Sequence, residues 1–120
     1  MFEQLYILNM NHWLPLQTEN DFQNIIQQSV ITPQIIFKHS TRCGTSHHAQ
    51  ARLADGSLLL SQKAGLHFLD LLQFRALSNL IADELGVMHQ SPQVLVLKNK
   101  EVVFKTSHHA IEVDKIVRYL

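Results

Sequence analysis

Apolar residues recur at helical spacing in several stretches of the chain. The first such stretch runs from Phe22 to Ile26 and places its apolar side chains on one face of a helix. Asn20-Asp21 offers a cap ahead of it, and the helix should end before Pro33, because the residue preceding a proline disfavours helix. We expect three further helices, which run from Cys43 to about Leu53, from Arg75 to Leu85 and from Ile111 to Leu120. Gly86 is placed to terminate the second of these.

Four other runs have the composition of β-strands. Ile35 to Lys38 is expected to form a buried central strand, and Leu66 to Leu72 a second strand. Val94 to Leu97 and Val102 to Phe104 flank the turn Asn99-Lys100, which predicts a β-hairpin. A helix joins the first two strands, so they should be parallel with a right-handed crossover, whereas the hairpin adds antiparallel strands.

The expected order is therefore helix, strand, helix, strand, helix, hairpin, helix. This is the order of the thioredoxin fold, an α/β fold in which helices flank a mixed sheet, here of about four strands. The 120 residues contain no repeat or low-complexity stretch, so we predict a single domain over residues 1–120. In such a fold the chemistry is expected at the carboxyl end of the first parallel strand, where a helix begins.

Composition narrows the classes of partner. Hydrophobic residues make up 46% of the chain and charged residues 17%, which is typical of a soluble globular protein. Ten basic residues balance ten acidic ones, which argues against broad electrostatic binding to nucleic acid or to an anionic membrane. No apolar run approaches a membrane span, and the first residues lack the pattern of a signal peptide, so we expect a cytoplasmic protein.

Cys43 is the only cysteine, so any disulfide must form with another molecule. It lies where the first strand passes through a polar loop into a helix. A helix N-terminus presents unpaired N–H groups and the positive end of the helix dipole, and both favour the thiolate and lower the thiol pKa. We therefore predict that Cys43 is a reactive, catalytic thiol. The alternative is a small buried hydrophobic residue, which the polar neighbours make less favourable.

The residues around Cys43 supply candidate thiol-stabilising groups. Arg42 adds a cation, and Ser46 can turn its hydroxyl toward the sulfur across one helical turn. Gly44 allows a small thiol to approach closely, and Thr45 completes the predicted set.

Pro92 is the second element of the predicted site. A proline before this strand can simply begin an edge strand, but in a thioredoxin-like fold it is usually cis and lies beside the reactive cysteine. The backbone of Ser91 would then pair with a peptide-like partner. His89 and His39 complete our candidate substrate-binding residues, because one precedes Ser91 by two positions and the other leads into the Cys43 loop.

Two motifs resemble the monothiol bacilliredoxin family. They are the run from Phe37 to Cys43 followed by Ser46, and the run from His89 to Gln93. The segments Ser78 to Val87 and, more weakly, the region around Trp13 are also similar to that family. The resemblance covers the chain from about Trp13 onward.

The resemblance implies a cytosolic, thioredoxin-like protein without a resident cofactor. Its partners would be bacillithiolated or otherwise S-thiolated proteins and a low-molecular-weight thiol, bacillithiol. Cys43 would take that thiol onto itself, and a second thiol would release it, because Ser46 stands where a dithiol redoxin keeps its resolving cysteine. Gly44-Thr45 departs from the proline and aliphatic residue expected there, which leaves the identity of the small thiol open.

Two other functions remain. Cys43 to Ser46 also resembles the Cys-Gly-Phe-Ser signature of monothiol glutaredoxins, which use glutathione and can carry an iron–sulfur cluster between two subunits. Ser91-Pro92-Gln93 and Ser107-His108-His109 depart from that family. Alternatively, Cys43, His47 and His39 could bind zinc or copper, but His47-His48 more simply form a solvated helix face, so we predict no metal site.

Overall fold

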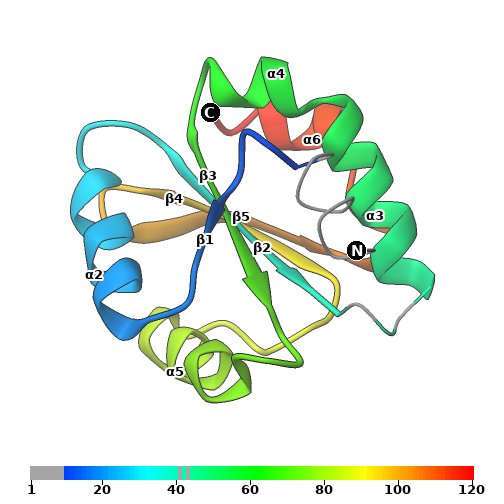
Figure 1. Ribbon diagram of the computed structural model, residues 1–120. Coiled ribbons are helices and arrows are strands. Elements are labelled where there is room, and N and C mark those ends of the chain that lie inside the picture. The colour runs from blue at the N-terminus through cyan, green and yellow to red at the C-terminus, as the bar shows by residue number, and fades with distance from the viewer. Residues whose placement is uncertain (1–9, 41, 43) are drawn as a thin grey trace.

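The computed structural model describes residues 10–40, 42 and 44–120. Within these ranges the chain forms a five-stranded mixed sheet with the order β1-β3-β2-β4-β5 (Figure 1). Strands β1, β3 and β2 are parallel, β4 is antiparallel to β2, and β5 is antiparallel to β4. The strands are β1 (Leu14–Pro15), β2 (Gln34–His39), β3 (Gly65–Asp70), β4 (Gln93–Lys98) and β5 (Glu101–Ser107). This confirms the predicted α/β thioredoxin-like fold, with the two-residue β1 as an additional strand.

Helices cover both faces of the sheet. They are α2 (Glu19–Gln28), α3 (Gly44–Asp55), α4 (Ser57–Ser61), α5 (Arg75–Leu85), the 3-10 helix η1 (His108–Ala110) and α6 (Val113–Val117). One buried apolar cluster joins the sheet to α3, α4 and α6, and a second joins it to α2 and α5 (Figure 1). Phe37 lies in the first cluster and Ile36 in the second, because neighbouring residues of a strand point to opposite faces. Strand β2 is therefore buried on both sides, as its apolar composition predicted.

Two predicted helix boundaries were wrong. Helix α2 is capped by Thr18, not by Asn20-Asp21: the Thr18 hydroxyl accepts a hydrogen bond from the Asp21 N–H at 3.0 Å. The Asp21 carboxylate accepts in return from the Thr18 N–H at 3.1 Å, which completes a capping box. The last helix is also shorter than predicted, because α6 spans only Val113–Val117 and η1 precedes it.

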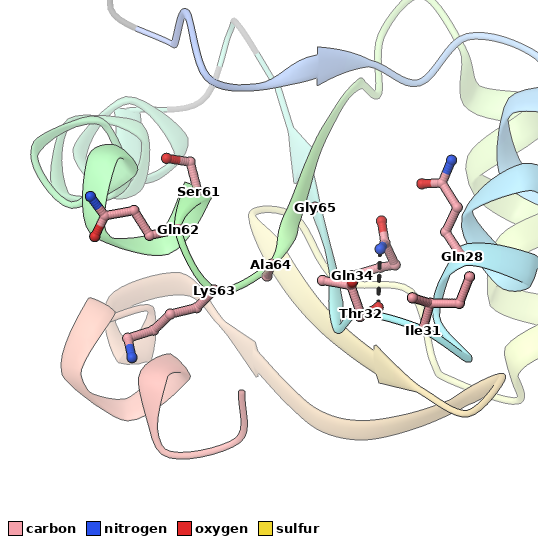
Figure 2. A pocket seen from close by; sticks show the side chains of 9 residues that line it. All are labelled: Gln28, Ile31, Thr32, Gln34, Ser61, Gln62, Lys63, Ala64 and Gly65. Carbon is pink, nitrogen blue, oxygen red and sulfur yellow. Dashed lines mark hydrogen bonds between the residues drawn. The ribbon is translucent and has the colours of Figure 1, made fainter.

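Gly65 allows a close approach at the amino end of the parallel strands. A Cβ built on Gly65 would lie 2.2 Å from Gln34 Oε1. That oxygen lies 2.7 Å from His67 Nε2, and the Gln34 Nε2 donates to Thr32 O at 3.0 Å. Figure 2 shows Gly65, Thr32 and the Gln34 side chain, with its hydrogen bond to Thr32, among the residues that line a pocket of about 290 Å³. The Gln34 side chain is thus fixed by hydrogen bonds at both ends of its amide and cannot move aside without losing one.

We therefore expect Gly65→Ala to lower the free energy of unfolding by about 1–3 kcal/mol, because the new methyl group displaces the buried Gln34 amide. Urea unfolding measures this change. Gly44→Ala is the matched control, since nothing lies within 4 Å of a Cβ built at Gly44. An equal effect of the two substitutions would contradict the steric explanation.

Candidate active site

Three chain segments emerge at one edge of the sheet. His39 pairs with Asp70 at the ends of β2 and β3, and Lys38 pairs with Gln93 at the start of β4. The residues after His39, after Asp70 and before Gln93 therefore lie at the same edge. This is the edge at which the sequence predicted the chemistry. Cys43 itself lies outside the described residues, so its catalytic role stays a prediction.

The helix that follows Cys43 in the sequence begins at Gly44. Helix α3 extends for 12 residues and has no acidic residue in its first turn, so no carboxylate there offsets the positive end of its dipole. Gly44 is exposed, Thr45 is partly buried, and Arg42 is an exposed turn residue. Chain neighbours and the backbone of its own helix aside, no atom lies within 4 Å of a Cβ built at Gly44, which leaves room beside it for a small thiol. The thiol-stabilising roles of these three residues remain predictions.

Ser46 closes the loop between β2 and α3. Its side chain is fully buried, and its hydroxyl oxygen accepts a hydrogen bond from the Ser40 N–H at 3.1 Å. This bond ties the first turn of α3 to the residue that follows β2. The predicted contact of the Ser46 hydroxyl with the Cys43 sulfur involves a residue outside the described ranges and stays a prediction.

Ser46→Ala should leave the buried Ser40 N–H without its acceptor and lower the free energy of unfolding by about 1–3 kcal/mol. The measurement is urea unfolding at pH 7. Ser61→Ala serves as the control, because the Ser61 hydroxyl bonds an exposed carbonyl of its own helix. Its effect should stay within about 0.5 kcal/mol. A Ser46→Ala protein as stable as the Ser61→Ala protein would show that this loop contact is dispensable.

The Ser91–Pro92 peptide bond is cis, as expected. Pro92 is buried, Ser91 is partly buried, and the Pro92 carbonyl accepts from the His108 N–H at 3.0 Å. Arg52 of α3 donates to the carbonyls of His108 and Ile111 at 3.2 and 2.7 Å, and thereby holds η1 beside this loop. The arrangement fixes the position of the loop from both α3 and η1. Pairing of Ser91 with a substrate stays a prediction.

His39 lies beneath the surface of this edge. Its exposed fraction is 0%, and its ring packs against Phe37, Phe68 and His47 with centroids 5.5, 5.4 and 5.6 Å away. Burial lowers the pKa of His39 to about 4, although the Asp70 carboxylate opposes this shift. The imidazole is therefore neutral near pH 7. A direct contact between His39 and a substrate would require the residues above it to move.

His89 lies on the loop that carries Ser91 and Pro92. It is partly buried, and its Nδ1 lies 3.4 Å from the Ser78 hydroxyl of α5. Burial lowers the pKa of His89, and the positive charges of Lys38 and Arg75 lower it further. Its contact with a substrate stays a prediction.

Lys38 was not among the predicted site residues. This lysine is fully buried in β2, and its Nζ donates to the Ser78 carbonyl at 3.1 Å. Burial lowers the pKa of Lys38 to about 8. The available signal was a lysine inside a run predicted to be buried on both faces of the sheet.

The described residues bring together no group of three or more His, Cys, Asp or Glu side chains that could hold a metal ion. In the same ranges, no helix is long and apolar enough to cross a membrane.

Solved structures with the same fold include several thioredoxins. The chain matches a candidate oxidoreductase with a thioredoxin fold at a TM-score of 0.81 and 24% identity, over 92% of this chain and 96% of the other. Mitochondrial thioredoxin 3 of Saccharomyces cerevisiae, in its oxidised form, matches at 0.71 and 18%, over 93% and 99% of the two chains. Fasciola hepatica thioredoxin matches at 0.68 and 17%, over 88% and 98%. At these identities the comparison establishes the fold.

The sequence comparison is more specific. The family described as "Monothiol bacilliredoxin BrxC" matches residues 14–116, a range that contains β2, α3, the Ser91–Pro92 bond and all five strands. Because the match extends over most of the chain, the protein belongs to the monothiol bacilliredoxin family, whose members are thiol–disulfide oxidoreductases.

Proposed function

We propose that this protein removes bacillithiol from protein mixed disulfides, with Cys43 as the nucleophile. The Cys43 thiolate attacks the bacillithiol sulfur of the mixed disulfide, and the client protein leaves as a thiolate that takes up a proton. Cys43 and bacillithiol are then joined by a disulfide. A second bacillithiol thiolate attacks that disulfide, which releases the Cys43 thiolate and forms oxidised bacillithiol. The client thiol is regenerated, and one free bacillithiol is consumed as it joins the transferred bacillithiol in a disulfide.

The family match over residues 14–116 carries this proposal. Three features of the chain support it. Helix α3 begins immediately after Cys43 and has no acidic residue in its first turn, which favours a thiolate at that point of the sequence. The Ser91–Pro92 loop, which precedes β4, lies at the end of the sheet where β2 ends, and Cys43 follows β2 by four residues in the sequence. The only cysteine of the chain has no internal partner, so resolution needs an outside thiol.

A model protein carrying bacillithiol on one cysteine tests the proposal. Incubation with this chain should release the bacillithiol and give a protein–bacillithiol adduct at Cys43, detected by intact-mass spectrometry. Added bacillithiol should then remove the adduct. A parallel arm with glutathionylated protein distinguishes the small thiols, and preferential reaction there would favour the glutaredoxin-like alternative. No adduct in either arm would overturn the proposal.

The pH dependence of Cys43 alkylation tests the activated thiolate separately. We expect the iodoacetamide rate to reach half its maximum below about pH 8.5, the ordinary value for a cysteine thiol. A midpoint at or above that value would contradict activation by α3.

A further inference from the structure

Lys38 occupies a position where an apolar residue would ordinarily suffice. Its backbone lies in the centre of the sheet, between β3 and β4, and its side chain is fully buried. Its neighbour Ile36 belongs to the apolar cluster beneath α2 and α5, and alternation along the strand places Lys38 on that same face. Within the described residues, no carboxylate forms an ion pair with Lys38. Burying an ammonium group without a counter-charge costs folding free energy, so this lysine has no evident role in stability.

A hydrogen bond links Lys38 to α5, which contacts the loop that carries His89, Ser91 and Pro92. Its Nζ donates to the Ser78 carbonyl on α5 at 3.1 Å, and the Ser78 hydroxyl lies 3.4 Å from His89 Nδ1. His89 precedes Ser91 by two residues. The loop is also tied from β4, because Gln93, the residue opposite Lys38, donates from Nε2 to the Met88 carbonyl at 3.1 Å. Lys38 is thus linked by one hydrogen bond to Ser78, whose hydroxyl contacts the loop at His89, while its strand neighbour Gln93 separately fixes the loop at Met88.

Burial and two nearby cations favour the neutral form of the His89 ring. Burial is the larger cause that lowers the pKa of His89 below its ordinary value, and the positive charges of Lys38 from β2 and Arg75 from α5 lower it further. A neutral ring has one protonated nitrogen. His89 Nδ1 lies beside Ser78, the residue whose carbonyl the Lys38 ammonium contacts. A nearby cation favours a lone pair on that nitrogen and the proton on the other nitrogen, Nε2. The Ser78 hydroxyl then donates to Nδ1.

We infer that Lys38 is a positioning residue for thiol exchange, which acts through Ser78 to hold His89 as a neutral Nε2–H donor beside Ser91–Pro92. The Nε2–H would donate a hydrogen bond to a carbonyl or carboxylate oxygen of the incoming mixed disulfide. The inference rests on the proposed function, because the loop matters for exchange only if a substrate binds there. Lys38 touches no reacting atom in this role, and its effect is on substrate recognition.

Lys38→Met and Ser78→Ala test the network from both ends. Lys38→Met replaces the ammonium by an apolar side chain of similar length, and Ser78→Ala keeps the backbone carbonyl that Lys38 contacts. Two-bond proton–nitrogen NMR spectra report the tautomer of each histidine ring, and His89→Gln assigns the signal. We expect a single Nε2–H tautomer in the wild type and averaged ring-nitrogen shifts in both variants. Lys63→Met, an exposed lysine, is the matched control and should leave the spectrum unchanged.

Steady-state kinetics with a bacillithiolated protein test the expected effect on substrate binding. Both variants should raise KM about tenfold and change kcat by less than about twofold, since the lost interaction concerns binding. In the His89→Gln background, Lys38→Met should raise KM no further, because the two residues act in series. The alkylation midpoint of Cys43 should be unchanged in all variants.

Unchanged His89 ring shifts in both variants would overturn the inference, and so would an unchanged KM. A shifted alkylation midpoint would also overturn it, because Lys38 would then act on the thiol and not on the loop. If the wild type shows no exchange with any substrate, the proposed function fails, and the ring-nitrogen spectra alone still support or overturn the coupling of Lys38 to His89.

Discussion

Cys43→Ser should reduce the release of bacillithiol from a modified protein by more than about 1,000-fold, to the rate without the protein. A serine hydroxyl is not ionised near neutral pH, whereas a thiol at a helix N-terminus is largely thiolate. The serine oxygen also cannot form the disulfide that holds bacillithiol between the two steps. Single-turnover assays with a bacillithiolated protein measure the loss. Intact-mass spectrometry should show no adduct on the variant.

Arg118→Gln provides a matched control for this result. Arg118 is exposed at the end of α6 and is not among the residues of the site, so the substitution should leave the exchange rate within about twofold. Because Cys43→Ser changes a single atom, its circular dichroism spectrum and unfolding midpoint should remain close to those of the wild type. Exchange by the folded Cys43→Ser protein at a rate close to that of the wild type would show that the nucleophile is not this cysteine.

Helices and strands whose own residues show a clear pattern were predicted well. Helix α5 spans Arg75–Leu85 as expected, and Gly86 ends it with a left-handed φ of 65°, a conformation that glycine adopts without strain. The apolar runs gave β2 and β4 to within one or two residues, because strands buried on both faces need continuous apolar sequence.

Elements that depend on distant contacts were missed. Strand β1 has two residues, and what defines it is pairing with β3, in which Leu14 lies opposite His67. Helix α4 follows α3 after Gly56, and its Ser57 hydroxyl accepts from Trp13 Nε1 at 2.8 Å, a contact between residues 44 positions apart. Neither pairing leaves a periodic pattern in the sequence.

In the site, too, features with a local sequence pattern were predicted, and features that depend on distant contacts were not. The cis bond before Pro92 was expected, because proline at that place in the fold has a clear signature. The complete burial of the Lys38 and His39 side chains was not predicted. Both are polar residues at the end of an apolar strand, yet neither side chain is exposed. Burial by elements far along the chain determines their chemistry.

Acidification from pH 7 to pH 5 should lower the free energy of unfolding by about 4 kcal/mol, through His39 and His67. Burial lowers the pKa of each to about 4, whereas an unfolded histidine titrates near 6.5. Between these values the unfolded chain binds more protons than the folded one. The stabilisation is therefore complete above about pH 6.5 and is lost as the pH falls toward 4. At pH 5 each histidine accounts for about 2 kcal/mol. Urea unfolding at intervals of half a pH unit measures the slope.

Substitution separates the buried histidines from the other titrating groups. His67→Gln removes one of them and should reduce the loss of unfolding free energy between pH 7 and pH 5 to about half. His48→Gln should leave that loss unchanged because His48 is exposed.

The Asp21 carboxyl does not account for the loss between pH 7 and pH 5. Hydrogen bonds from the Gln17 and Thr18 N–H groups lower the pKa of its carboxyl below 3.8, so its stabilisation is lost at a lower pH than the histidine window. A free energy of unfolding that stays constant from pH 7 to pH 5 would contradict this prediction. It would mean that the two imidazole rings are hydrated or protonated in the folded protein. The packing of His39 between Phe37 and Phe68 and the bond of His67 to Gln34 argue against such local opening.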